Sequence, residues 1–590
     1  MTLPDPPPRW VRAVPAAWSS LLAVLLLGPA LGPGYVLSFD MVWVPDLVLR
    51  ADVLGVGTGL PRAVPSDAVV AVLDEVLPGA LLQDLVLLAA LVVGGLGVNR
   101  LLVPLDLGLP ARLAGLTLWQ WNPYVVERLV LGHWPVLVGY AALPWVLHGA
   151  SRWRVEGRCP ARLLLLVPLG SLSVSAGLAT SSALLVVLVA GRAPVRRVLA
   201  AAVLAVAAQA PWLVSGLLHA GAAVTDGEGA ALFALSDEGL LPAPLAAASL
   251  GGVWNAAVVP DSRQGLLAVV GLLVLAVLAA AGLAVLLRRP TPAARGLARP
   301  LAVLWAVGWG LAVLTWAAPG PVGDLAEVLP GAGVLRDGAR LLLLCVPLLV
   351  LLVALAVDAA ARRLRAARLP TPAVVALLGV LVLWPVTVLP DAAIGVAGRL
   401  DAVEYPSSYA GARAALEEAA PDGDVLVLPL SSYRAPDWND GRPVLDPLPR
   451  VLVPVPVASD DLVVDDVTVA GEDPRVRDAR VALAEPDPAA RAAALGRLGI
   501  AAVAEDLTAP GPRAEVAGEQ VWADERLRVL VLPEAEPRSV PTGWVAAMGL
   551  AWAAYLAVAA AGLVLALVRR RRGTGGSRGA THPMRRNLSG

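Results

Sequence analysis

The sequence predicts a mainly α fold: a polytopic membrane helix bundle of about twelve spans, with a small extracytoplasmic α/β domain before the last span. The 590 residues are 57% hydrophobic and their mean hydropathy is +0.72, values that are rare in a soluble chain of this length. The loops between the apolar stretches alternate between arginine-rich and acidic. One long charged segment, 391–540, interrupts the apolar pattern and predicts the α/β domain.

The arginine positions predict the orientation of the chain. Arginine-rich loops are typical of the cytoplasmic side of a membrane protein, so the acidic loops are expected outside. Both termini are then cytoplasmic, and the chain is expected to be a multi-pass protein of the plasma membrane. The sequence has no basic stripe with interleaved aromatic residues, so it gives no indication of nucleic-acid binding. The arginine-rich loops hold Arg152, Arg154, Arg158 and Arg162; Arg192, Arg196 and Arg197; Arg288, Arg289, Arg295 and Arg299; Arg362, Arg363, Arg365 and Arg368; and Arg569–Arg572.

A helix needs about 20 apolar residues to cross a bilayer, and this length defines the predicted spans. The first span is followed by an external loop at 34–80. The stretch 163–190 is too short for two full spans and has a small, polar centre at 171–182, which favours two short tilted helices or a re-entrant hairpin. Irregular backbone at membrane depth requires burial or a cavity, so a cavity is expected beside it. The predicted spans are 14–33, 81–103, 110–126, 134–149, 163–190, 198–219, 265–287, 301–318, 340–358, 372–390 and 543–568.

The predicted domains follow from these spans. Residues 1–390 form the transmembrane bundle, 391–540 the soluble domain, 541–570 the last transmembrane helix, and 571–590 a disordered cytoplasmic tail. Within the soluble domain we expect a buried strand at 425–430, a helix at 489–498 with a strand at 499–503, and a hairpin at 520–532 that turns at Asp524-Glu525. The two cysteines, Cys159 and Cys345, are too far apart in this topology to form a disulfide.

The first external loop holds the strongest candidate for chemistry. Asp40 follows the first span closely and has aromatic residues on both sides, so a partly desolvated carboxylate there is suited to take a proton from a hydroxyl. Asp46 is a second candidate, and the two carboxylates could together hold a divalent cation such as Mg²⁺ or Mn²⁺. The alternative is an ordinary solvated loop in which Tyr35, Phe39 and Trp43 anchor the chain at the membrane surface.

Two further clusters lie where spans leave the membrane. The first combines Glu127 and Arg128, charges that at such depth usually face a bundle interior or a cavity, with Asn122, His133 and Trp134 as neighbours. Its alternative is an interfacial belt with an ion pair that caps helices.

The second cluster comprises Arg336, Asp337 and Arg340, which follow a glycine-rich turn and could bind an anion. Its alternative is a polar loop with a helix cap. Arginine suits phosphate geometrically, so Arg128, Arg336 and Arg340 are the candidate phosphate ligands. Trp254, Asn255 and Arg263 form a weaker patch that favours a structural role.

At these residues the chain resembles the GT-C superfamily of polytopic membrane glycosyltransferases, including actinobacterial arabinofuranosyl- and mannosyltransferases. The late soluble segment resembles the external domains of GT-C-like and YfhO-like membrane proteins. The resemblance rests on Asn122-Pro123-Tyr124, Glu127-Arg128-Leu129, Gly132-His133-Trp134, Leu143-Pro144-Trp145 and the turn from Pro330 to Asp337, and in the soluble segment on Tyr405-Pro406, Leu428-Pro429, Trp438-Asn439 and Asp446-Pro447.

The resemblance implies a function. Enzymes of this superfamily take sugars from polyprenyl phosphates outside the cytoplasm, and their first-loop acidic residue is the proposed base or metal contact. By position this implies Asp40, with Asp46 as second choice. The loop lacks a tight Asp-x-Asp pair, so the need for a metal is left open.

The resulting hypothesis is an inverting glycosyltransferase that moves a sugar from a polyprenyl-phosphate donor to an envelope glycan or glycolipid acceptor. Its partners are the lipid-linked donor, the acceptor glycan and membrane lipids. Two alternatives remain at this stage: a non-catalytic scaffold of envelope polysaccharide assembly, and a transporter. Transporters usually show two similar halves, and no such repeat is visible in this sequence.

Overall fold

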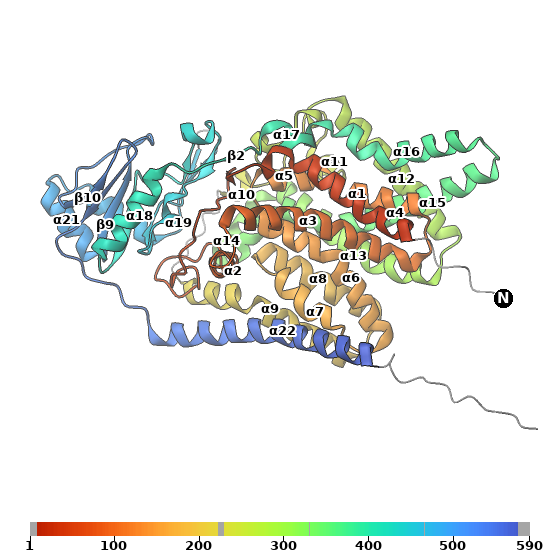
Figure 1. Ribbon diagram of the computed structural model, residues 1–590, viewed down its shortest axis with the longest axis horizontal. Helices are drawn as coiled ribbons and strands as arrows, with labels where there is room; N and C mark the ends of the chain where they lie inside the picture. Colours follow the sequence, from red (N-terminus) through yellow and green to blue (C-terminus); the bar gives the residue numbers. More distant parts are fainter. Residues whose placement is uncertain (1–8, 222–228, 330, 465–466, 576–590) are drawn as a thin grey trace, which may run out of the picture.

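The computed structural model describes residues 9–221, 229–329, 331–464 and 467–575. Figure 1 shows an elongated molecule in which the bundle helices run along the longest axis and the β-rich region lies at one end. The long helices of the bundle are α1 (Arg9–Leu27), α3 (Gly79–Leu102), α4 (Leu109–Gln120), α6 (Trp134–Glu156), α8 (Val174–Ala190), α9 (Val195–His219), α12 (Leu266–Arg288), α13 (Pro292–Ala317), α15 (Val346–Ala366), α16 (Thr371–Val388) and α22 (Thr542–Gly575).

Shorter elements fill the ends and the interior of the bundle. They are α2 (Ser66–Leu73), α5 (Pro123–Val130), α7 (Ala161–Leu169), α10 (Gly229–Leu232), α11 (Ala243–Ala248), α14 (Pro319–Val328) and α17 (Ala393–Gly398), with 3-10 turns η1 (Gly28–Leu31), η2 (Val103–Leu105), η3 (Ala256–Val258), η4 (Asp261–Arg263), η5 (Ala332–Leu335), η6 (Gly338–Leu344) and η7 (Pro390–Ala392).

The number of spans differs from the sequence prediction. Over the described residues, seven helices are long and apolar enough to cross a membrane, or eight if the bent pair η6 and α15 counts as one span. The expected number of about twelve is therefore not confirmed. At about 1.5 Å per residue, α4 with 12 residues and α7 with 9 are shorter than a bilayer core of about 30 Å. Most side chains of α4 are buried inside the protein, and the hydropathy of a sequence cannot distinguish such burial from contact with lipid.

The stretch that the sequence predicts to be irregular at membrane depth contains a break between two helices. The break lies at the small, polar centre of the stretch, as predicted. Helices α7 and α8 meet at residues 170–173, and the Ser173 side chain caps α8 by accepting a hydrogen bond from the backbone N–H of Ala176. Ser171 donates to the carbonyl of Val167 within the preceding turn. These hydroxyls satisfy backbone groups that the break leaves without helical partners.

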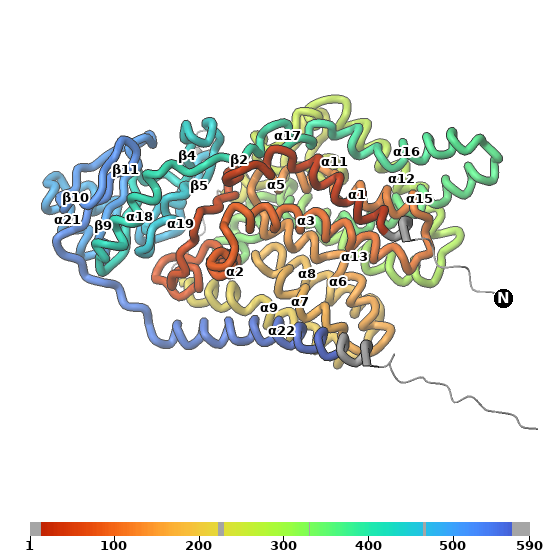
Figure 2. Tube along the Cα trace, viewed as in Figure 1, coloured from red at the N-terminus to blue at the C-terminus, as the bar shows by residue number. Residues whose placement is uncertain are grey.

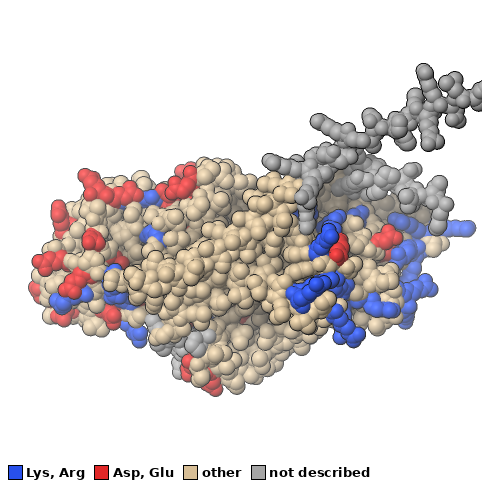
Figure 3. Space-filling view, turned by 90° about the horizontal axis from the view of Figure 1, so that it is seen from below, with Lys and Arg blue, Asp and Glu red and all other residues tan. Residues whose placement is uncertain are grey.

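Charge separates along the long axis of the molecule. Figure 3 shows arginine side chains gathered at the end opposite the β-rich region, a broad uncharged belt over the middle, and acidic side chains mostly at the β-rich end. This is the distribution expected of a protein that crosses a membrane between two charged ends. Helix α22 runs from the β-rich end along one side of the bundle (Figure 2) and packs on α9 and α7. The predicted tail is helical as far as Gly575, and 576–590 lie outside the described residues.

The segment between α16 and α22 forms an α/β domain around a five-stranded sheet of order β10-β11-β9-β3-β6. Strand β3 is parallel to both neighbours, whereas β9, β11 and β10 pair antiparallel. The expected strand, helix, following strand and hairpin are confirmed as β3, α21, β9 and β10–β11. The elements are β2 (Ala402–Val403), α18 (Ser407–Ala419), β3 (Asp424–Leu428), β4 (Tyr433–Arg434), η8 (Asp437–Asn439), β5 (Val444–Leu445), α19 (Leu448–Val451), β6 (Pro456–Val457), β7 (Leu462–Val464), β8 (Val467–Val469), α20 (Pro474–Leu483), α21 (Pro488–Arg497), β9 (Ile500–Asp506), β10 (Glu519–Ala523) and β11 (Leu527–Val531).

The first external loop is built into this α/β domain. Strand β1 (Tyr35–Val36) pairs antiparallel with β2, and the backbone of Phe39 exchanges hydrogen bonds with Pro443 and Leu445. One continuous hydrophobic core contains Leu37 of the loop, bundle residues and strands of the sheet. The loop predicted to be a separate external segment is therefore a structural part of both the bundle and the soluble domain.

The buried Arg50 also links the first loop to the α/β domain, and its removal should destabilise the protein. Arg50 donates hydrogen bonds from Nη1 to the carbonyls of Pro449 (3.1 Å) and Leu452 (2.6 Å). Arg50→Ala leaves both carbonyls unpaired, so we expect a loss of about 2–4 kcal/mol, measured by thermal unfolding in detergent. The control is Arg152→Ala, which breaks the exposed ion pair with Glu156 and should cost about 0–1 kcal/mol. Equal losses in the two variants would refute this role of Arg50.

Candidate functional site

A cavity of about 1060 Å³ lies between the membrane bundle and the α/β domain. The α7–α8 break contributes Leu172 to Ser175 to its wall, which confirms the cavity expected beside the polar stretch. Charged, polar and aromatic groups from five parts of the chain line the rest: Asp40, Arg62 and Asp67; His133 and Trp134; Phe233, Trp254 and Asn255; Arg336 and Arg340; and Tyr433, Arg450, Asp460, Asp461 and Glu472.

Asp40 lies in the cavity wall with both carboxylate oxygens engaged. His133 Nε2 is 3.1 Å from Oδ2, and the Tyr433 hydroxyl donates to Oδ1 at 2.5 Å. The backbone N–H of Asp40 donates to the carbonyl of Leu131 at 3.0 Å. The side chain is still 40% exposed, so the carboxylate is oriented by protein on one side and open to the cavity on the other.

The electrostatics of this position favour the ionised carboxylate. Burial acts to raise the pKa of Asp40, but the hydrogen-bonding and electrostatic interactions with His133, the hydrogen bond from Tyr433 and the charge of Arg340 outweigh it and hold the pKa below its ordinary value. Asp40 is therefore a carboxylate throughout the physiological pH range.

The loop reaches His133 because Gly132 leaves room for it. Gly132 adopts φ = +79°, and a Cβ atom built there would lie 1.9 Å from the backbone nitrogen of Met41. Any side chain would collide with the loop that carries Asp40. The glycine thus brings the start of α6 and the first loop into contact.

Behind His133 lies a buried cluster of charges. Arg128 Nη1 is 3.1 Å from His133 Nδ1 and 3.3 Å from Asp337 Oδ2, and Arg340 Nε donates to the same Asp337 oxygen at 2.7 Å. Burial would raise the pKa of Asp337, but the two arginines lower it to about 2. Arg128 is fully buried, so this candidate phosphate ligand faces the cluster, whereas Arg336 and Arg340 reach the cavity.

The remaining predicted residues near α5 have structural partners. Asn122 caps α5 by accepting a hydrogen bond from Val125 N–H. Glu127 is buried beside Glu238, which pairs with Arg263, and burial followed by the nearby Glu238 charge raises the pKa of Glu127 well above its ordinary value. Trp134 lines the cavity and packs against Trp43, with ring centroids 4.9 Å apart.

Asp46 is not brought to the cavity. Its side chain is 54% exposed and pairs with Arg413 of α18 at 2.7 Å, so it belongs to the outer surface of the loop. The proposed pairing of Asp40 with Asp46 around a cation is therefore not present. Among the described residues, no group of three or more His, Cys, Asp or Glu side chains is placed to hold a metal ion.

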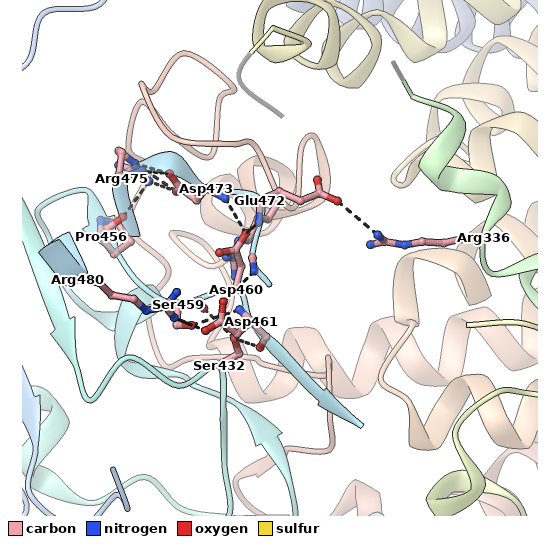
Figure 4. A network of polar contacts seen from close by, with 12 residues as sticks. Arg336, Ser432, Pro456, Ser459, Asp460, Asp461, Glu472, Asp473, Arg475 and Arg480 are labelled. Carbon is pink, nitrogen blue, oxygen red and sulfur yellow. Dashed lines mark hydrogen bonds and ion pairs between the residues drawn. The ribbon is translucent and has the colours of Figure 1, made fainter. Parts of the chain in front are cut away.

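Sequence reasoning missed the contribution of the α/β domain to the site. Tyr433 lies 393 residues from Asp40, and no local pattern marks it. Two ion pairs also cross from bundle to domain, Arg62 with Asp460 and Arg336 with Glu472, each at 3.4 Å. Figure 4 shows Arg336 reaching from the bundle side toward Glu472, while Asp460 and Asp461 lie within the polar network of the domain.

The fold of this bundle and domain is similar to that of a solved membrane glycosyltransferase, in line with the fold that the sequence resemblance implied. Two solved structures of arabinofuranosyltransferase AftD from Mycobacteria match it. One has a TM-score of 0.55 at 18% identity, with 90% of this chain and 40% of that chain covered; a mutant form has a TM-score of 0.52 at 16% identity, with 90% and 42% covered. The chain thus spans about two fifths of the AftD length. No family model and no curated protein sequence matches the chain.

The buried charge cluster yields a stability prediction. Asp337→Asn removes the counter-ion of Arg128, which then stays charged in a site that excludes water. Breaking a buried ion pair in this way costs about 3–5 kcal/mol, and we expect a loss of that size in denaturant unfolding of the purified protein. Asp46→Asn breaks only a surface pair and should cost about 0–1 kcal/mol. An Asp337→Asn protein as stable as wild type would show that the cluster does not stabilise the fold.

Proposed function

We propose that this protein is an inverting membrane glycosyltransferase that takes a sugar from a polyprenyl phosphate and transfers it to an envelope glycan or glycolipid. The observation that carries the proposal is Asp40: an ionised, oriented carboxylate that faces a cavity at the junction of a membrane bundle and a soluble domain. The fold similarity to an arabinofuranosyltransferase supports a glycosyltransferase of this type. The acceptor glycan would contact the α/β domain.

The proposed reaction requires a base and a charge-stabilised leaving group. Asp40 accepts the proton of an acceptor hydroxyl as the acceptor oxygen forms a bond to the anomeric carbon. The bond between that carbon and the phosphate oxygen breaks on the opposite face, and its electron pair leaves with the lipid phosphate. Attack from the face opposite the phosphate inverts the anomeric configuration.

Arg340 is the best-placed group to stabilise the departing phosphate. It lines the cavity, its side chain is about one third exposed, and its charge acts on Asp40 and His133 alike. Arg336 also reaches the cavity, but the charge of its guanidinium is shared with Glu472, which it contacts at 3.4 Å. Positive groups that face developing negative charge lower the barrier to such a reaction. We assign Arg128 to the support of His133 because it is fully buried.

The residues of the site supply no reason to include a metal ion in these steps. Both oxygens of Asp40 already accept hydrogen bonds from His133 and Tyr433. We infer from the arginine distribution that the cavity and the α/β domain face the outside of the plasma membrane and that both termini are cytoplasmic.

The central test is transfer of radiolabelled sugar from a panel of polyprenyl-phosphate donors to envelope-glycan acceptors by purified protein. Asp40→Asn should lower kcat by about 10²–10⁴-fold, the usual contribution of a general base. Asp46→Asn, in the same loop but on its outer surface, should retain wild-type transfer. Equal transfer by the wild type and Asp40→Asn would place the base elsewhere. A folded wild type that transfers from no donor would favour the scaffold hypothesis.

A second test concerns pH. Tyr433 donates to the charged form of Asp40, so Tyr433→Phe should raise the pKa of Asp40. Activity that needs the carboxylate is present above this pKa and is lost as the pH falls through it. The acid limb of kcat/KM should therefore move to higher pH in Tyr433→Phe, by about one unit or more for a hydrogen bond to a charged group.

The matched control for this test is Tyr555→Phe. Tyr555 donates to the carbonyl of Pro168 from helix α22, away from the cavity, so its removal should leave the profile in place. An acid limb that is the same in Tyr433→Phe and wild type would mean that Tyr433 does not control Asp40.

A further inference from the structure

His133 stands between two groups of opposite charge, and both of its ring nitrogens are engaged. Its Nε2 lies 3.1 Å from Asp40 Oδ2, and its Nδ1 lies 3.1 Å from Arg128 Nη1. The histidine and Arg128 are both buried, whereas Asp40 opens to the cavity. The three side chains therefore contact one another in the order Arg128, His133, Asp40, from the interior of the bundle to the cavity wall.

The chemistry of arginine decides which nitrogen of His133 carries the proton. A guanidinium group has only donors, so in its contact with Arg128 the His133 Nδ1 must accept. The ring proton is then on Nε2, which donates to Asp40. A doubly protonated ring would direct an N–H at the N–H of Arg128 and would add a second cation to a buried site.

The charged and titratable neighbours on every adjoining element agree with a neutral ring. Cations Arg128 on α5 and Arg340 in η6 oppose protonation, and Asp40 on the first loop favours it. Asp337 is a further carboxylate of the cluster, and it is held by both arginines. Tyr433 contacts Asp40, and Tyr124 and Glu127 lie on the Arg128 side of the cluster. Burial, with the two arginines, lowers the pKa of His133.

We propose that His133 is a positioning residue held by Arg128 in the neutral tautomer with its proton on Nε2, and that it orients Asp40 and keeps it ionised. The catalytic part of this inference rests on the proposed function, whereas the tautomer does not. His133 itself transfers no proton, because its only ring proton stays in the hydrogen bond to Asp40. Asp337, which pairs with Arg128, supports the tautomer from one step further inside.

The tautomer can be measured without any enzymatic assay. Solid-state NMR of ¹⁵N-histidine-labelled protein in lipid bilayers separates protonated from unprotonated ring nitrogens, and His133→Gln identifies the signals of this one among four histidines. We expect an unprotonated Nδ1 and a protonated Nε2 that persist from about pH 5 to 8, where a free histidine would titrate. A doubly protonated ring near neutral pH, or a proton on Nδ1, would overturn the proposal.

Kinetics test the positioning role with two variants of the same residue. His133→Leu removes the donor, whereas the amide of His133→Gln can still donate to Asp40. We expect kcat to fall about 10–100-fold in His133→Leu, the equivalent of one charge-assisted hydrogen bond, with its acid limb moved to higher pH. His133→Gln should recover most of the loss, and Asp46→Asn controls for loop substitutions.

The possible failures are distinguishable. If Asp40→Asn abolishes transfer but His133→Leu keeps the wild-type kcat and pH profile, the positioning role is wrong and the proposed function stands. If the wild type transfers no sugar while the NMR shows the Nε2 tautomer, the proposed function is wrong and the tautomer assignment stands.

Discussion

A single carboxylate, Asp40, is held by two parts of the chain, the helix bundle and the α/β domain. His133 contacts it from the bundle, and Tyr433 contacts it from the α/β domain. Neither part alone fixes the carboxylate, because each supplies a partner for only one oxygen. The pairing of β1 with β2 and the backbone contacts of Phe39 keep the two parts in register around it. The geometry of the site therefore depends on the docking of domain and bundle.

The charges behind Asp40 follow from the cost of burying ions. Arg128 is among the largest fully buried side chains, and such a cation persists only where counter-charge and hydrogen bonds offset its lost hydration. Asp337 supplies the counter-charge, and His133 supplies an acceptor. The buried ion pair between Arg128 and Asp337 thus holds the Arg128 guanidinium in contact with His133, a residue of the cavity wall. This arrangement gives Arg128 a role that its sequence position alone did not indicate.

Sequence reasoning reached the elements whose signal is local. Periodicity predicted strands β3 and β9, and the polar stretch at 171–182 predicted both the helix break and the cavity. It overestimated the number of spans because helices such as α4 are apolar through burial in protein. It placed Asp40 and Arg340 at one site, but it missed Tyr433 and gave Asp46 a place beside Asp40. The errors at Tyr433 and Asp46 share a cause, because contacts between residues that are hundreds of positions apart leave no pattern in a single sequence.

The 393 residues that separate Asp40 from Tyr433 have a consequence for biogenesis. At about 5–20 residues per second, the ribosome makes Tyr433 roughly 20–80 s after Asp40. Throughout that time the first loop has no β2, β5 or α19 to pack against. The carboxylate acquires its second partner only when most of the chain has been inserted. The cavity is thus among the last features of the molecule to assemble, and an unfinished chain displays the loop without a completed site.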